Sequence, residues 1–139
     1  MKRISRNQML QEMVRVVAKR SSCLRLQVGA LVARDGRVLS SGYNGAPSGL
    51  PHCSPETCGP DRPCTATVHA EAGAIAYAAR HGIPIEGSSL YCTNSPCLDC
   101  AKLIINAGII HVDYQIPYRV IEGIELLKLA GIRVTNNGD

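Results

Sequence analysis

Two short stretches of the sequence carry residue types that can bind a metal ion and move a proton. His69 and Glu71 are separated by one alanine, and Cys97 and Cys100 are separated by two residues. Zinc prefers imidazole and thiolate ligands, and residues three apart on a helix share a face. We therefore expect His69, Cys97 and Cys100 to bind one zinc ion (Zn2+) and to leave its fourth tetrahedral position open to water, as catalytic zinc sites do.

Glu71 has a different predicted role. Residues two apart do not share a helical face, so we do not expect Glu71 to coordinate the ion that His69 binds. Zinc lowers the pKa of a bound water to about 7, and Glu71 would accept the proton of that water as a general base. The hydroxide would then attack a ring carbon that bears an amine, and Glu71 would return protons to the ring nitrogen 3 and to the departing ammonia.

The elements expected around these residues place both stretches at helix N-termini. One helix is expected from residue 67 or 68 to about residue 81, and another has Ser95 as its N-cap and Pro96 as its first residue, ending before Gly108. Helix N-termini favour negative charge, so they suit thiolates and a zinc-bound hydroxide alike.

The rest of the pattern predicts an α/β fold. Asp35-Gly36 joins two apolar runs as a hairpin turn does, and residues 5–8 have the form of a capping box before a helix over about 6–19. A further helix is expected over about 121–130. Helices separate the last three strands, so those strands should pair in parallel in a five-stranded mixed sheet with helices on both faces, a three-layer α/β/α fold. The predicted strands are 28–33, 38–41, 89–93, 111–116 and 132–135.

Length and composition limit the function classes. With 139 residues, 45% of them hydrophobic, residues 1–139 are expected to form one domain. A net charge of +4 favours an anionic ligand weakly and is too small for a nucleic-acid signature, and the absence of Phe and Trp leaves no strong stacking platform. Because no apolar run would span a bilayer and no signal peptide is visible, we expect a cytoplasmic protein with no membrane partner and no nucleic-acid partner.

The sequence has seven cysteines. Cytosolic thiols stay reduced, so these residues are read as metal ligands or buried thiols. Cys92 is expected to be a small buried hydrophobic residue of a strand. Residues 44–66 show no sustained period, and long loops of this kind are usually functional or held by a metal. The cysteines still without a role are Cys23, Cys53, Cys58 and Cys64.

A His-x-Glu stretch followed by Pro-Cys-x-x-Cys is the signature of zinc-dependent nucleobase deaminases. The sequence resembles the deoxycytidylate deaminase branch of the cytidine deaminase superfamily over nearly its whole length. Its Gly-Tyr-Asn-Gly-x-Pro-x-Gly segment is the feature most specific to this branch. The matching stretches are Gln27–Ala30, Gly42–Gly49, Thr67–Glu71, Ser95–Lys102, Ala107–Ile109 and Gly123–Leu127.

The resemblance implies a small-molecule substrate. It implies hydrolysis of deoxycytidylate (dCMP) to deoxyuridylate (dUMP) and ammonia, which supplies the precursor for thymidylate synthesis. Asn44 would bind the sugar, the Ala70 amide would bind the cytosine carbonyl oxygen, and the Ser95 carbonyl would accept from the amine. Tyr118 and Arg25 would lie near the phosphate. From the residues alone, Asn44 could shape its turn, Tyr118 could be a packing residue and Arg25 a solvated charge.

Other implications of the resemblance concern metals and assembly. Similar proteins use cysteines at the positions of Cys23 and Cys53 in a structural zinc site, which Cys58 and Cys64 would complete; otherwise these are loop thiols. The resemblance also implies a homo-oligomer, usually a hexamer, with dCTP as activator, dTTP as inhibitor and Mg2+ accompanying the triphosphate. One departure is Gly73, where the family pattern His-Ala-Glu-x-Asn has asparagine.

Three alternatives remain from the sequence. A deaminase of free cytidine would use the same zinc ligands, whereas a deaminase of adenosine in transfer RNA would need a more basic surface. The segment over residues 42–49 favours mononucleotides over either. A zinc-stabilised binding module without catalysis leaves Glu71 and the three-ligand set unexplained. The sequence does not distinguish dCMP from 5-modified dCMP or from dCTP.

Overall fold

The computed structural model describes residues 1–56, 58 and 64–137. The strands lie within two residues of the predicted ranges. The elements are α1 (Arg6–Ala18), β1 (Gly29–Arg34), β2 (Arg37–Tyr43), α2 (Ala70–Arg80), β3 (Ser89–Asn94), α3 (Leu98–Asn106), β4 (His111–Ile116), α4 (Glu122–Leu129) and β5 (Arg133–Asn136).

The five strands form one mixed sheet in the order β2-β1-β3-β4-β5. β1 pairs antiparallel with both β2 and β3, while β3, β4 and β5 are parallel. The parallel pairing was predicted from the intervening helices, and the hairpin of β1 and β2 was predicted from its turn. The antiparallel contact between β1 and β3 was not predicted, because a long segment separates these strands in the sequence.

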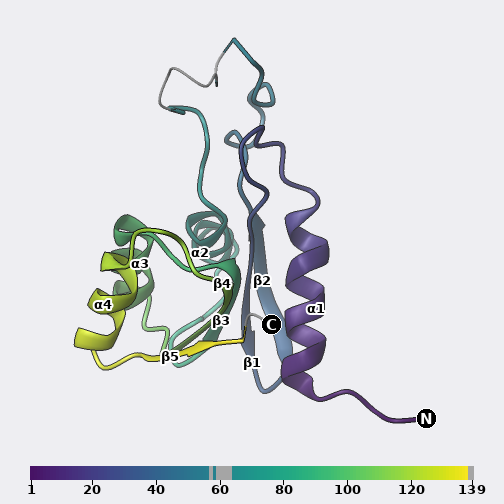
Figure 1. The fold of residues 1–139 in the computed structure, drawn as a ribbon, viewed down its shortest axis with the longest axis vertical. Coiled ribbons are helices and arrows are strands. Elements are labelled where there is room, and N and C mark those ends of the chain that lie inside the picture. Colours follow the sequence, from purple (N-terminus) through teal and green to yellow (C-terminus); the bar gives the residue numbers. More distant parts are fainter. Residues whose placement is uncertain (57, 59–63, 138–139) are drawn as a thin grey trace.

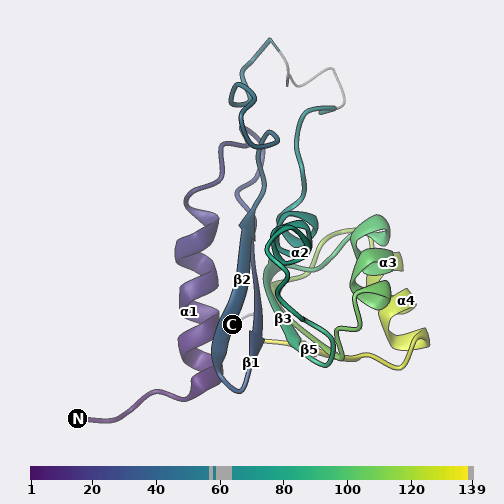
Figure 2. The same cartoon turned by 180° about the vertical axis from the view of Figure 1, so that it is seen from behind.

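Helices cover both faces of the sheet, which confirms the three-layer fold. α1 lies on one face, and α2, α3 and α4 lie on the other (Figure 1, Figure 2). Strand alternation divides the core accordingly: Leu31 and Tyr91 pack with α1, whereas Ala30, Leu90 and Val112 pack with the other helices. The site described below lies on the side of α2 and α3.

Local sequence explains the ends of α1 and of the hairpin. The Ser5 hydroxyl accepts from the Gln8 amide, and the Gln8 side chain accepts from the Ser5 amide, so the predicted capping box is present. Asp35 and Gly36 have φ angles of 54° and 74°, as the two central residues of a type I′ turn require. Both predictions are therefore confirmed.

The start of α2 differs from the prediction. Val68 exchanges two backbone hydrogen bonds with Gly45, so residue 68 is extended and cannot begin a helix. α2 begins at Ala70, and His69 is its N-cap. A contact with a residue far away in the sequence thus delays the helix by two residues and puts His69 at its end.

The prediction that Ser95 caps α3 was wrong. The Ser95 amide donates to the Ile116 carbonyl, which extends the pairing of β3 with β4, and the Ser95 hydroxyl accepts from the Tyr118 amide at 2.6 Å. Ser95 therefore has other partners, and Cys97 is the N-cap of α3. Pro96 precedes the helix.

Residues 44–56, 58 and 64–66 form an irregular segment that rises above the carboxyl end of β2 (Figure 1). The described part of this segment contains no helix and no strand beyond the single bridge at Gly45, as its sequence predicted. Among the described residues, no helix is long and apolar enough to span a bilayer.

The packing of β2 against α2 gives a stability prediction. A Cβ on Gly42 would lie against the Ala70 carbonyl oxygen and 2.6 Å from the Ala74 nitrogen, whereas a Cβ on Gly73 would lie 4.0 Å from the Gly42 Cα. Gly42→Ala should cost about 1–3 kcal/mol because the strand must move away from the helix. Gly73→Ala should stabilise by up to about 1 kcal/mol, because alanine favours the helix. Urea unfolding of both variants tests this, and a fully stable Gly42→Ala variant would contradict the packing.

Candidate active site

His69, Cys97 and Cys100 converge as the sequence predicted. The His69 Nδ1 atom lies 3.4 Å from the Cys97 sulfur and 3.4 Å from the Cys100 sulfur. In the described part of the chain these residues form the one group of three potential metal ligands, with ligand atoms within 4.8 Å of one another. Tetrahedral zinc with nitrogen and sulfur ligands spaces them roughly 3.5 to 3.8 Å apart. The three side chains therefore fit a zinc ion.

Two of these residues occupy equivalent places in the fold. His69 and Cys97 are the N-caps of α2 and α3, and Cys100 lies in the first turn of α3. The His69 ring makes no capping hydrogen bond, so it is free to act as a ligand, while the Cys97 sulfur accepts from the Cys100 amide at 3.5 Å. The positive ends of two helix dipoles thus meet at the three ligands and favour thiolates there.

The charges of the two thiols are strongly linked. Hydrogen bonds from Cys100 and His69 lower the pKa of Cys97 to about 3, while Cys97 and burial raise the pKa of Cys100. The hydrogen bond to Cys97 raises the pKa of His69. The Cys97 thiolate is therefore stabilised by its two neighbours, and a metal ion that bound here would displace the protons that the group carries.

Glu71 lies in the first turn of α2, beside the three ligands but outside their group. Its side chain is 4% exposed, and burial raises the pKa of its carboxyl group. Its carboxyl group also contacts the Cys100 thiol through a hydrogen bond. A buried carboxyl group of raised pKa next to a metal site suits a proton shuttle, because the shift brings its pKa closer to that of a zinc-bound water.

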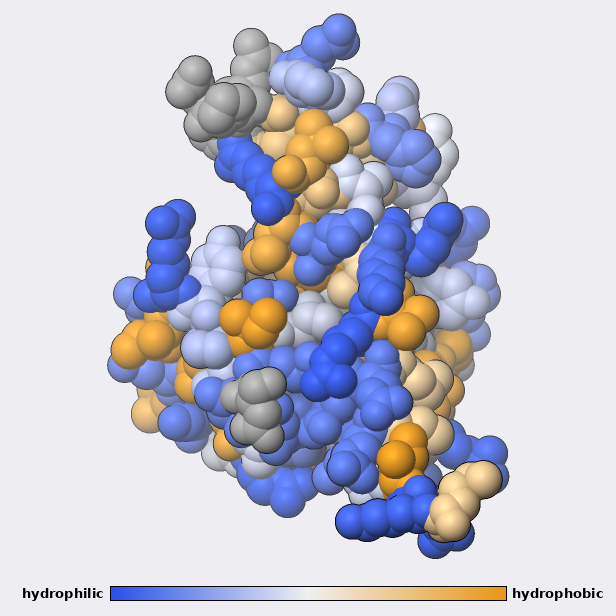
Figure 3. All heavy atoms as spheres, turned by 45° about the vertical axis from the view of Figure 1, so that its right-hand side comes forward, coloured by the Kyte–Doolittle hydropathy of each residue, from blue (hydrophilic) through white to orange (hydrophobic). Residues whose placement is uncertain are grey.

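A cavity of about 210 Å³ opens at His69, Cys97 and Glu71. In the space-filling view the described part of the irregular segment stands above the body of the molecule, with a hollow between them (Figure 3). All the residues predicted to bind substrate line this cavity. They are Arg25, Asn44, Ala70, Ser95 and Tyr118.

Asn44 has a structural role beside its place in the cavity. Its Oδ1 accepts from the Val28 amide at 2.8 Å, and its Nδ2 donates to the Leu26 carbonyl at 2.7 Å. These bonds hold the wall of the cavity before β1. The turn-shaping role that the residue type allowed is thus present, and a contact with the sugar stays a prediction.

Sequence reasoning missed Asn94. It is the last residue of β3, it is 7% exposed, and it lines the cavity. Its Oδ1 accepts from the Thr93 hydroxyl at 3.0 Å. The sequence feature that could have indicated it is a polar residue at the end of an apolar strand, directly before the stretch that carries Cys97.

Cys53 and Cys64 lie beside Thr67. The Thr67 hydroxyl lies 3.0 Å from the Cys64 sulfur and 3.4 Å from the Cys53 sulfur. Thr67 lowers the pKa of Cys64 to about 7, while burial and the hydrogen bond with Cys64 raise the pKa of Cys58. Cys23 contributes to the charge around Cys58 and lines the cavity together with Cys64.

Cys92 is separate from this group. It is completely buried in the core on the α2 and α3 side of the sheet, as predicted.

Comparisons with known proteins agree with this arrangement. Residues 4–116 match the family described as cytidine and deoxycytidylate deaminase zinc-binding region. The chain is 42% identical over 136 residues to ComE operon protein 2 of Bacillus subtilis, covering 96% of this chain and 72% of that protein. It is 34% identical to the deoxycytidylate deaminase of Schizosaccharomyces pombe, covering 88% of this chain and 41% of that enzyme.

Among solved structures, the fold matches the dCMP deaminase of cyanophage S-TIM5 in complex with dCMP and dUMP. The TM-score is 0.88 at 33% identity, over 98% of this chain and 99% of the phage enzyme. Family match, sequence identity and fold agree, and the chain therefore belongs to the cytidine and deoxycytidylate deaminase family.

Proposed function

We propose that this protein hydrolyses dCMP to dUMP and ammonia, with one zinc ion held by His69, Cys97 and Cys100. The observation that carries the proposal is the buried Glu71 carboxyl group beside three metal ligands in an open cavity. The similarity to the phage enzyme over nearly the whole of both chains supports dCMP as the substrate.

We assign the residues of this chain the following roles in the reaction. Zinc, when bound, supplies a water molecule of lowered pKa at the open position. Glu71 would take a proton from that water and give it to ring nitrogen 3. It would then take the proton of the hydroxyl group added to the ring carbon and give it to the amine, which leaves as ammonia while the carbonyl group forms. The amide of Ala70 belongs to the first turn of α2 and has no partner within the helix, so it is available to the cytosine carbonyl oxygen.

Four further residues would orient the nucleotide. The Ser95 carbonyl accepts from the departing amine, and Asn44 binds the sugar. Arg25 and Tyr118 bind the phosphate, since both line the cavity and an anionic group is stabilised by a guanidinium and a hydroxyl donor. The bond between the Tyr118 amide and the Ser95 hydroxyl ties the two ends of this substrate site together.

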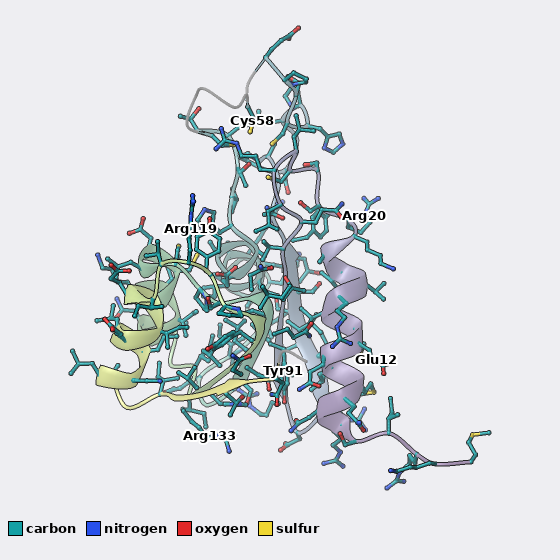
Figure 4. All side chains as sticks on the ribbon, viewed as in Figure 1. Glu12, Arg20, Cys58, Tyr91, Arg119 and Arg133 are labelled. Carbon is teal, nitrogen blue, oxygen red and sulfur yellow. The ribbon has the colours of Figure 1, made fainter. Side chains whose placement is uncertain are left out.

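The second cysteine group would hold a structural zinc ion. Cys53, Cys58 and Cys64 are linked through Thr67 and through each other, and a thiol of lowered pKa such as Cys64 is a ready ligand. Cys23 would supply the fourth thiolate. Figure 4 places Cys58 high in the irregular segment, so such a zinc ion would fix the segment above the cavity.

The remaining proposals rest on family membership. The protein would be a single cytoplasmic domain that assembles as a homo-oligomer, with a hexamer as the expected state. It would respond to dCTP and dTTP as effectors, with Mg2+ accompanying the triphosphate.

Replacing the proton shuttle should separate metal binding from turnover. Glu71→Gln should retain the catalytic zinc, because Glu71 is not a ligand, and should lose at least about 10²- to 10⁴-fold in kcat. The ultraviolet change that accompanies deamination measures kcat, and elemental analysis measures zinc. Glu12→Gln is the matched control, since Glu12 lies on α1 across the sheet (Figure 4). Near-normal turnover in Glu71→Gln would contradict the mechanism.

Substrate choice tests the phosphate contacts. The parent protein should prefer dCMP to deoxycytidine, and Arg25→Gln or Tyr118→Ala should lower that preference by about tenfold to a hundredfold, as for the loss of a charge-assisted hydrogen bond. Arg133→Gln is the control, because Arg133 lies at the opposite end of the molecule from the irregular segment (Figure 4). Equal kcat/KM for nucleoside and nucleotide in the parent would exclude the mononucleotide assignment.

Two cysteine variants test the second zinc ion. Cys58→Ser should halve the zinc content and lower the thermal stability, because structural zinc contributes directly to folding. Cys97→Ser should abolish activity with a smaller loss of stability. Zinc analysis and thermal unfolding measure both. One zinc ion per fully active parent chain would exclude the structural site and leave the catalytic site in place.

A further inference from the structure

Asn94 has a place in the cavity that the reaction described above does not use. Along β3, Leu90 and Cys92 belong to the core on the α2 and α3 side of the sheet, and strand alternation puts Asn94 on the same side. Asn94 lies at the carboxyl end of the strand, where the core gives way to the cavity. It is 7% exposed, so it is almost fully enclosed by the protein.

Its hydrogen bonds fix the orientation of its amide group. The Gly29 amide donates to the Thr93 hydroxyl at 3.0 Å, and this hydroxyl donates its single hydrogen to the Asn94 Oδ1, also at 3.0 Å. The carbonyl end of the Asn94 amide is therefore occupied, and the Nδ2 group faces the other way.

The Nδ2 group is open to the cavity. In the described part of the chain, no group accepts a hydrogen bond from Asn94 Nδ2. Nδ2 is also not a buried atom without a partner, since the one such side-chain atom among those residues is Asp113 Oδ1. Because Asn94 is enclosed apart from the cavity that it lines, its two N–H donors are available to a group in that cavity.

The edges of a bound pyrimidine decide which group these donors meet. In the proposed reaction Ala70 binds the carbonyl oxygen, Glu71 serves nitrogen 3, and the Ser95 carbonyl binds the amine. Nitrogen 1 carries the sugar, which leaves the C5 edge, next to the carbon that bears the amine. Asn94 directly precedes Ser95 and lines the same cavity, so the C5 edge, next to the amine that Ser95 would bind, is the edge that its amide would meet.

We propose that Asn94 is a specificity-determining residue that reads the substituent at C5 of the pyrimidine, and that the site favours a hydroxymethyl group there over a methyl group. The inference rests on the proposed function. A hydroxymethyl oxygen accepts from Nδ2, whereas a methyl group displaces the water that otherwise accepts and leaves the enclosed donors unpaired.

Binding of the three product nucleotides tests this without turnover. The zinc-loaded parent protein should bind 5-hydroxymethyl-dUMP at least about tenfold more tightly than thymidylate, the 5-methyl product, because the site's enclosed donors reject an analogue without an acceptor. dUMP, with hydrogen at C5, is the reference. Isothermal titration gives the three Kd values, and kcat/KM for the corresponding cytosine nucleotides should follow the same order.

Two variants remove the donors in different ways. Asn94→Leu is similar in size and apolar, and Asn94→Asp keeps the acceptor for Thr93 but carries no N–H group. In both, the preference for hydroxymethyl over methyl should fall to about one or reverse. Asn106→Asp makes the same change on the exposed end of α3 and should keep the parent's preference. Comparing ratios within each variant cancels any general loss of affinity.

The outcomes separate this inference from the proposed function. A parent protein that deaminates dCMP but binds the hydroxymethyl and methyl products equally well overturns the role of Asn94 alone. The same conclusion follows if both variants keep the parent's ratio. A parent protein that does not deaminate dCMP overturns the proposed function, and the inference with it.

Discussion

The N-terminal turns of α2 and α3 meet at one point, and the site depends on that meeting. His69 and Cys97 are the caps of these helices, and Cys100 lies in the first turn of α3. Two positive helix ends this close would repel each other unless negative charge lay between them. The Cys97 thiolate supplies that charge, and a zinc ion shared by the three ligands would join the helices directly. The arrangement that serves chemistry is therefore also a packing contact between two helices.

The remaining walls of the cavity are held to the sheet by a few specific bonds. Ser95 is tied to the strand end at Ile116 and to the Tyr118 amide, and Asn44 fixes residues 26–28 through both ends of its amide. Segments that are irregular in secondary structure thus have well-defined partners. Preorganised groups of this kind can bind substrate without the cost of first ordering a loop.

Local patterns predicted much of the fold and the metal ligands. The capping box at Ser5, the turn at Asp35-Gly36 and the strand ranges follow from residue type and spacing, and so does the joint pattern of His69, Cys97 and Cys100. The spacing of the two cysteines is informative because it brings both sulfur atoms to one side of the helix start. This holds whether Cys97 is the N-cap or lies within the helix.

Features that depend on distant residues could not be predicted. Ser95 is a good N-cap by type, but its amide and hydroxyl bond to the end of β4 and the residues after it, and Val68 is extended because it pairs with Gly45. The direction of the Asn94 amide depends on the Gly29 amide, which lies in another strand. Asp113 is buried and accepts hydrogen bonds from Thr135 and Asn137. The sequence likewise does not indicate these contacts.

The central claim is that His69, Cys97 and Cys100 hold a zinc ion with an open position facing the substrate cavity. Cobalt substitution tests it most directly, because thiolate ligands give cobalt strong charge-transfer bands and its visible bands report the number of its ligands. The account predicts bands that change when dUMP is added to the parent protein, and no such change in Cys97→Ser. A spectrum that dUMP leaves unaltered in the parent, or a response that survives in Cys97→Ser, would contradict it.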